Sequence, residues 1–189
     1  MARKMIKPKK KVMAKKAGAK VKKKVAAKAK SKPKKVSFIP KGYASITPYL
    51  IVEGASTAIK FYQNVFGAKN VMRMDTPDGK VAHAELTIGD SKIMLSDGCP
   101  EMDMKGPKSY GGAAVSVHLY VKNVDEVVKK AVKEGAKLLQ EVQDKFYGDR
   151  SGLIEDPFGH QWGVSTHVEN VTPAKMKKRM QEQFTLNKA

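Results

Sequence analysis

A faint internal repeat constrains the fold of this chain more than any other feature. Residues 45–66 begin with an apolar stretch and, after a short turn, place apolar side chains at helical spacing. Residues 114–135 repeat this order. The two helical patterns end alike, at Gly67-Ala68-Lys69 and at Gly135-Ala136-Lys137, 68 residues apart. The repeat therefore predicts two copies of one strand–helix unit, each helix ending near a glycine.

Further strands are predicted after each helix. The alternating apolar segments are 70–76, 81–88 and 92–96 in the first half, and 137–142, 153–155 and 161–167 in the second. Turn-forming sequences such as "TPDGK" and "DPFG" separate them. The prediction is an α+β fold of two tandem βαβββ modules, 45–97 and 113–168, forming a curved mixed sheet around a cavity. One helix covers one face of each half-sheet, and the opposite faces are expected to form a shared concave surface.

Residues 1–41 differ in composition from the rest of the chain. They hold 18 of the 37 Lys and Arg residues and no Asp or Glu, so most of the formal net charge of +19 belongs to them. Such a Lys/Ala-rich segment cannot bury enough apolar surface to offset chain entropy, which predicts a disordered basic tail. In composition it resembles the basic arms of linker-histone-like proteins. We expect it to bind DNA, RNA or another polyanion without sequence specificity; a solubilising extension is the alternative. The candidate contacts are Lys9, Lys10, Lys11, Lys15, Lys16, Lys22, Lys23, Lys24, Lys34 and Lys35.

The remaining composition restricts the class of protein. No apolar run approaches the roughly 18–20 residues that a membrane span needs, and no secretory signal is evident. The single cysteine, Cys99, excludes a disulfide within the chain and fits a reducing compartment. The sequence thus predicts a cytoplasmic protein without a transmembrane segment, and association with the nucleoid is a hypothesis that follows from the basic tail.

Three stretches carry a family resemblance: "FYQNVFGA", "PDGKVAHAELTIGDSKIML" and "GLIEDPFGHQWGVSTHVENVTPAKM". Their order and spacing, over about residues 43–181, resemble the vicinal-oxygen-chelate superfamily of glyoxalases, bleomycin-resistance proteins and extradiol dioxygenases, and within it the PhnB-like subgroup. The resemblance implies paired βαβββ modules, a homodimer, and a small-molecule cavity lined by the concave sheet. Catalytic members of the superfamily chelate a divalent ion, whereas its drug-binding members need none.

The same resemblance assigns the positions at which metal-binding members carry a ligand. In this chain those positions hold Thr47, Met94, Ser116 and Gly163. None of these is a normal ligand for zinc, nickel, iron or magnesium. No cofactor is therefore expected at the usual site.

Alternation along the predicted strands assigns the side chains that face the cavity. The predicted ligand-binding residues are Thr47, Tyr49, His83, Glu85, Met94, Ser116, His118, Tyr120 and Gln161. His83 and Glu85 lie two residues apart in "VAHAELTIGD", on one face of one strand. With His118 they are candidate catalytic residues, either as a displaced site for a divalent metal or as a metal-free pair that moves protons. The alternative is that they are polar lining residues that bond to their neighbours.

Three functions stay open at this point. The first is a metal-free protein that binds a small aromatic or cationic molecule in the cavity. The second is a glyoxalase-type lyase or isomerase with a displaced metal site or with no metal. The third is a nucleoid-associated DNA-binding protein that uses the fold as a dimerisation scaffold.

The segments outside the modules carry further expectations. The domain is expected to span residues 42–171 and a C-terminal helix and tail 172–189, with Thr172 as N-cap and Pro173 at the first helical position. Its apolar residues follow at i, i+4 and i+8, which predicts an amphipathic helix that docks on the body or on a partner subunit; they are Met176, Met180 and Phe184. The linker 97–112 is either a lid or a plain connector.

Two residues near the end of the second module also carry predictions. Trp162 is expected in the core. Arg150 is expected to pair with Asp149 or Glu155, although its guanidinium could also bind an anionic ligand.

Overall fold

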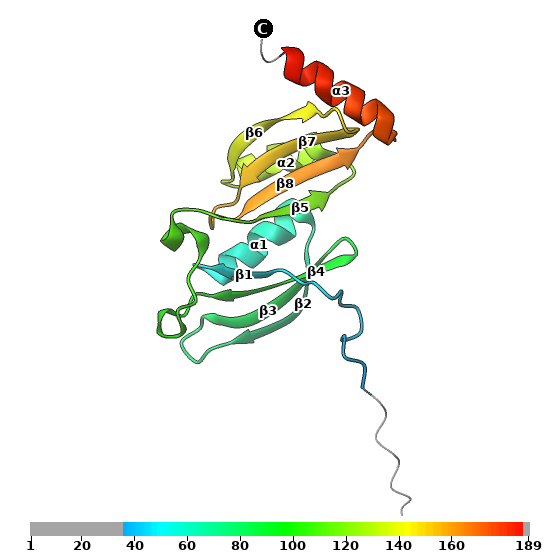
Figure 1. Ribbon diagram of the computed structural model, residues 1–189. Coiled ribbons are helices and arrows are strands. Elements are labelled where there is room, and N and C mark those ends of the chain that lie inside the picture. The colour runs from blue at the N-terminus through cyan, green and yellow to red at the C-terminus, as the bar shows by residue number, and fades with distance from the viewer. Residues whose placement is uncertain (1–35, 187–189) are drawn as a thin grey trace, which may run out of the picture. The chain divides into compact units, whose positions relative to one another are not determined.

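The structure, a computed structural model, describes residues 36–186 of the 189-residue chain (Figure 1). All ten lysines predicted to contact nucleic acid lie outside the described residues. The two predicted modules are both present. Each is a four-stranded mixed sheet with one helix, which confirms the βαβββ order and the α+β class.

The first module contains β1 (Tyr49–Val52), α1 (Ala55–Phe66), β2 (Lys69–Asp75), β3 (Val81–Ile88) and β4 (Ser91–Asp97). Its strands are ordered β1-β4-β3-β2, with β1 parallel to β4 and the other pairs antiparallel. The first strand begins four residues later than predicted, directly after Pro48, which has no N–H to donate to a ladder.

The second module contains β5 (Ser116–Tyr120), α2 (Val124–Lys133), β6 (Lys137–Asp144), β7 (Asp149–Glu155) and β8 (Gln161–His167). Its order, β5-β8-β7-β6, repeats that of the first sheet. The register repeats too, since Tyr49 pairs with Met94 in the first sheet and His118 pairs with Gly163 in the second. The repeat in the sequence therefore corresponds to a repeat in strand pairing.

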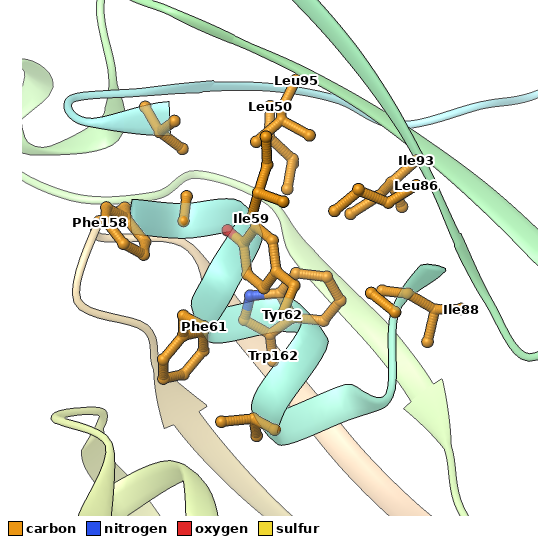
Figure 2. Packing of buried hydrophobic residues seen from close by; sticks show 14 of the residues in the cluster. Leu50, Ile59, Phe61, Tyr62, Leu86, Ile88, Ile93, Leu95, Phe158 and Trp162 are labelled. Atoms are coloured by element: carbon orange, nitrogen blue, oxygen red, sulfur yellow. The ribbon is translucent and has the colours of Figure 1, made fainter. Parts of the chain in front are cut away.

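One hydrophobic core joins the two modules. Helix α1 packs on its own sheet and also on Trp162 of β8, whose ring centroid lies 5.4 Å from that of Tyr62 and 4.7 Å from that of Phe66 (Figure 2). Trp162 is 1 % exposed, which confirms its predicted place in the core. Asp156 sits in the same core and accepts hydrogen bonds from the Tyr62 hydroxyl at 2.7 Å and from the Trp162 indole N–H at 2.9 Å. Burial and the neighbouring Asp156 raise the pKa of Tyr62 well above its ordinary value.

This shared core determines where the open faces of the sheets lie. The helix-covered faces of both sheets contribute to it, so the open faces, opposite the helices, point away from it. Within the described residues the strands form two separate four-stranded sheets. The residues predicted to line one cavity are consequently divided between two open faces of the single chain.

The linker and the C-terminal helix complete the described chain. The linker contains two short 3₁₀ helices, η1 (Pro100–Met102) and η2 (Pro107–Tyr110). Helix α3 (Pro173–Leu186) begins at the predicted position, with the Thr172 hydroxyl accepting from the Lys175 N–H at 3.4 Å. None of the described helices is long and apolar enough to cross a membrane.

The apolar stripe of α3 does not dock on the body as predicted. Met180 is 38 % exposed and Phe184 62 % exposed. Polar contacts to Glu169 hold the helix instead, from Lys175 and Arg179. Docking of the stripe on a partner subunit stays a prediction.

Candidate functional site

The open face of the first sheet carries a connected group of polar side chains, which we call the first-sheet cluster: Tyr43, Tyr49, His83, Glu85 and Lys92. The Tyr49 hydroxyl lies 3.1 Å from His83 Nδ1. His83 Nε2 lies 3.6 Å from Glu85 Oε1, within ion-pair range but longer than a hydrogen bond. The side chains of His83 and Glu85 are 18 % and 12 % exposed. Sequence reasoning correctly placed both on one face of one strand.

Glu85 is held by groups that come from outside its own strand. The Tyr43 hydroxyl, from the segment before β1, donates to Glu85 Oε2. Lys92 Nζ lies 3.5 Å from the same oxygen and 3.9 Å from the centroid of the Tyr43 ring. The hydrogen bond from Tyr43, followed by the contacts with His83 and Lys92, lowers the pKa of Glu85 below its ordinary value. Glu85 is therefore a carboxylate at neutral pH, and Tyr43 is a cluster member that strand alternation could not reveal.

A buried hydroxyl lies on the same face. Ser96 of β4 pairs with Ile51 of β1. On the other side of β4, Leu95 pairs with Ala84 of β3, so the next residue along each strand places Ser96 across from His83. Ser96 is 2 % exposed, and its Oγ has no hydrogen-bond partner within the described part of the chain.

A cavity of about 320 Å³ lies between β1 and the linker. Gly106 of the linker packs closely on β1, because a Cβ added there would lie 3.1 Å from the Ile51 carbonyl oxygen. His160 contacts the same carbonyl, because its Nε2 lies 3.1 Å from the Ile51 oxygen. The cavity is lined mainly by apolar and aromatic side chains, among them Tyr49, Ile51, Pro107, Tyr110, Val115 and His160, with Lys105 as its charged residue. Tyr49 belongs both to this cavity and to the first-sheet cluster.

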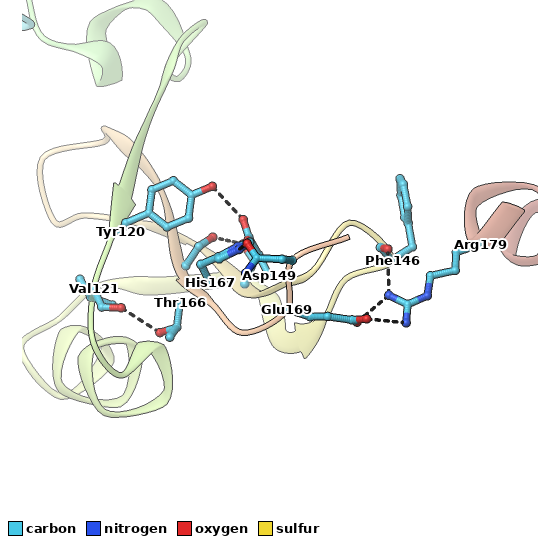
Figure 3. Close-up of polar contacts among 11 residues, drawn as sticks. Tyr120, Val121, Phe146, Asp149, Thr166, His167, Glu169 and Arg179 are labelled. Atoms are coloured by element: carbon cyan, nitrogen blue, oxygen red, sulfur yellow. Dashed lines mark hydrogen bonds and ion pairs between the residues drawn. The ribbon is translucent and has the colours of Figure 1, made fainter. Parts of the chain in front are cut away.

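The second sheet carries a different polar group, here called the second-sheet cluster: Tyr120, Asp149, His167 and Asn170 (Figure 3). The Tyr120 hydroxyl donates to Asp149 Oδ2 at 2.8 Å, and His167 Nδ1 lies 2.7 Å from Asp149 Oδ1. His167 Nε2 lies 3.1 Å from Asn170 Oδ1. The hydrogen bond to Asp149 raises the pKa of both Tyr120 and His167 above their ordinary values. Asp149 is 4 % exposed.

Sequence reasoning missed Asp149 and His167 as members of a site. The predicted pairing of Arg150 with Asp149 or Glu155 is wrong. Arg150 instead binds Asp125, with Nη2 2.7 Å from Oδ1, and Asp144, at 3.2 Å. Because Asp149 and His167 pair directly across β7 and β8, only the register of the sheet brings them together.

The other predicted site residues do not gather in one place. His118 of β5 packs beside Tyr120, with ring centroids 5.0 Å apart, and not with His83 or Glu85. Ser116 pairs with Gln161 at the far end of the same ladder. In the first module Thr47 and Met94 are both half-buried.

The chain matches the glyoxalase/bleomycin resistance protein/dioxygenase superfamily over residues 43–164. It belongs to this superfamily. It is 37 % identical over 142 residues to an uncharacterized protein of Mycobacterium bovis, a match that covers 74 % of this chain and 93 % of the relative.

Solved structures show the same fold. Protein PA1353 of Pseudomonas aeruginosa is 25 % identical, with a TM-score of 0.56, over 67 % of this chain and 99 % of that one. A PhnB protein of Bacillus cereus is 21 % identical, with a TM-score of 0.53, over 65 % of this chain and 99 % of that one. The predicted superfamily is thus confirmed.

The residues of this superfamily member do not fit the usual divalent metal. A Cβ atom at Gly163 would lie 2.8 Å from His118 Nδ1, so the ring of His118 fills the space of any ligand side chain there. Thr47, Met94 and Ser116 supply hydroxyl and thioether groups, which are poor ligands for a hard divalent ion.

The displaced metal site predicted from His83, Glu85 and His118 is not formed. His118 lies on the other sheet, and the described residues contain no group of three or more His, Cys, Asp or Glu able to hold a metal ion. The shared core is the reason, because it separates the two open faces within one chain.

Proposed function

We propose that this superfamily member binds a small aromatic molecule at the first module without the usual metal. The observation that carries the proposal is the cavity between β1 and the linker, where aromatic and apolar side chains adjoin the first-sheet cluster. Binding sites for small molecules typically combine an apolar lining with a few placed polar groups. The PhnB-like subgroup is part of the same proposal and is supported by likeness of fold to the Bacillus cereus protein.

The test is calorimetric titration of the purified protein with a panel of hydroxylated and unsubstituted aromatic compounds. Tyr110 lines the cavity and is 64 % exposed, so Tyr110→Ala should leave the fold intact. We expect it to weaken binding about tenfold, since a lost aromatic contact is worth roughly 1 kcal/mol or more. Phe184→Ala removes an equally exposed ring outside the cavity and should change nothing.

Elemental analysis of the same preparation tests the metal-free part of the proposal. We expect no stoichiometric zinc, iron, nickel or manganese. A divalent ion that survives dialysis and is lost on changing residue 47, 94 or 116 would contradict it.

We further propose a homodimer that buries the open faces. Apolar side chains are exposed on the open face of the first sheet, notably Met72 at 40 % and Met74 at 51 %, which pair with Glu85 and His83. Exposed apolar surface of this kind commonly marks an interface. Sedimentation equilibrium should give twice the chain mass, and a monomer at micromolar concentration would contradict the proposal.

The basic tail supports a second proposed function, contact with nucleic acid. Residues 1–41 carry 18 basic residues and no acidic ones. Deleting them should abolish retention of DNA at 50 mM salt, and the full chain should lose roughly 10³–10⁵ in affinity between 50 and 200 mM salt if six to ten phosphates are contacted. The core residues lie between Leu50 and Val164, so the deletion should not change thermal unfolding. DNA binding that survives the deletion would refute this role, and with it the hypothesis of a nucleoid-associated protein.

A further inference from the structure

We propose that Tyr49, His83 and Glu85 form a proton-accepting chain that recognises small molecules bearing an acidic hydroxyl group, with phenols as the class. The inference rests on the proposed binding of aromatic molecules beside β1. It assigns the polar part of that recognition to side chains on β1 and β3, and it needs no metal ion.

The order of the contacts sets the direction in which a proton can move along Tyr49, His83 and Glu85. Glu85 is an acceptor only, because its carboxylate is ionised. It therefore favours the His83 tautomer with hydrogen on Nε2, the nitrogen 3.6 Å from its oxygen. That tautomer leaves Nδ1 free to accept the hydrogen of the Tyr49 hydroxyl, 3.1 Å away. The contact between His83 and Glu85 is long, as such contacts often are before a ligand binds.

Tyr49 connects this chain to the cavity. It is 43 % exposed and is one of the residues that line the cavity. Ile51 of β1, and Pro107 and Tyr110 of the linker, also line the cavity and offer apolar contacts to a planar ring. A hydroxyl on that ring can donate to the Tyr49 oxygen, which is an acceptor as well as a donor.

The proton transfer balances within the site. The ligand hydroxyl gives its proton to the Tyr49 oxygen while the Tyr49 proton moves to His83 Nδ1. The products are a ligand oxyanion that accepts a hydrogen bond from Tyr49, and a histidine cation facing Glu85. No electron is transferred and no co-reactant is needed.

Charged side chains adjoin the three residues. Glu85 faces His83, and Lys92 lies 3.5 Å from Glu85. Tyr43 holds Glu85 through its hydroxyl.

The second sheet contains a tyrosine that lacks this arrangement and so serves as a control. Tyr120 donates to Asp149, and His167 contacts the other oxygen of that carboxylate. There the histidine cannot take a proton from the tyrosine directly. Tyr120→Phe therefore removes one hydroxyl from an open face without touching the proposed chain.

The experiment uses 4-nitrophenol, whose visible absorption distinguishes the hydroxyl form from the anion. The full-length protein is titrated into the probe at a pH at which free probe is mostly protonated. We expect saturable binding with an increase in the anion band. Tyr49→Phe and His83→Gln should remove that increase and weaken binding about tenfold, the value of one hydrogen bond to a charged group. Tyr120→Phe should behave as the wild type.

The outcomes separate this inference from the proposed function. Saturable binding with the spectrum of the free probe would overturn the proton-accepting chain and leave small-molecule binding standing. An increase in the anion band that persists in Tyr49→Phe would overturn it too. No saturable binding of this probe or of any other aromatic compound would overturn both proposals. Circular dichroism of the two variants, both changed at a sheet surface, checks that they are folded.

Discussion

At the scale of single residues, buried Asp156 is the most heavily bonded side chain of the core. Its Oδ2 accepts from Tyr62 and Trp162, and its Oδ1 accepts from the backbone N–H groups of Phe158 and His160, both at 2.9 Å. Asp156 is 2 % exposed. One carboxylate thus satisfies donors from α1, from β8 and from the turn before β8.

Asp156→Ala should destabilise the protein by about 3–5 kcal/mol, because it leaves buried donors without a partner. Asp156→Asn should also cost about 2 kcal/mol or more, since an amide of the same size turns donor hydrogens toward either the indole or the backbone N–H groups. Urea unfolding followed by circular dichroism measures both changes. An Asn variant as stable as the wild type would show that shape, not acceptor chemistry, matters at this position.

Position 148, between β6 and β7, requires glycine because of its backbone conformation and its close neighbours. Its φ is +100°, and an added Cβ would clash with the carbonyl oxygen of Glu169. Its own carbonyl accepts from the N–H groups of Val168 and Glu169 at 3.0 and 2.9 Å. The turn is therefore packed against the segment that leads to α3.

Gly148→Ala should cost about 3 kcal/mol or more, from left-handed strain together with a backbone clash. Gly79→Ala is the matched control, because Gly79 has a φ of +85° but no atom within 4 Å of an added Cβ. It should cost only the strain, about 1–2 kcal/mol. Thermal unfolding compares the two, and equal losses would contradict the packing argument.

At the scale of elements, α3 depends on one carboxylate for its position. Glu169 accepts from Lys175 at 2.6 Å. It also accepts from Arg179 at 2.7 Å, and Arg179 donates to the Phe146 carbonyl (Figure 3). These hydrogen bonds, that from Arg179 first, lower the pKa of Glu169 from 4.5 to about 2. A lowered pKa means that the helix is held while Glu169 is ionised and is released as the pH falls.

We expect the position of α3 to be stable above pH 4.5 and to be lost progressively between there and about pH 2. The effect on total stability is modest, because the Glu169 side chain is 37 % exposed. The NMR signal of the Met176 methyl group reports the position of α3. Glu169→Gln should reproduce the acid spectrum at neutral pH.

Glu182→Gln is the control for that change. It removes a carboxylate of the same helix that makes only an exposed contact of 4.0 Å with Lys178. Its spectrum should match the wild type at every pH. A Met176 signal unchanged by Glu169→Gln would show that something other than this ion pair holds the helix.

At the scale of the whole molecule, we expect the two modules to fold as one cooperative unit. The single tryptophan, Trp162, lies where α1 of the first module meets β8 of the second. Neither module can bury its share of this core without the other.

Unfolding followed by Trp162 fluorescence and by circular dichroism should therefore give coincident transitions in urea, the usual test of two-state behaviour. Phe66→Ala, which removes a first-module contact to Trp162, should shift both curves equally. Fluorescence that changes before the circular dichroism signal would mean that the modules separate before they unfold.

The sequence by itself determined the elements of this protein. Hydrophobic periodicity, the two glycines after the helices, and the Thr172-Pro173 start of α3 are local signals, and local backbone preferences decide helices and turns. Alternation along β3 likewise placed His83 and Glu85 together, because a strand fixes side-chain direction residue by residue. The superfamily followed from the order of these local features.

Only the tertiary structure decided which polar groups meet. Arg150 binds Asp125 rather than Asp149, Asp149 binds Tyr120 and His167, and Asp156 reaches a tyrosine 94 residues away. It also decided that the two open faces point away from one core, which keeps His118 from His83 and places its ring in the space above Gly163. The physical reason is that the alternation of side chains along a strand decides only which face of the sheet each residue lies on. Contacts between distant segments depend instead on strand register and on how the modules pack, and no short stretch of sequence encodes these.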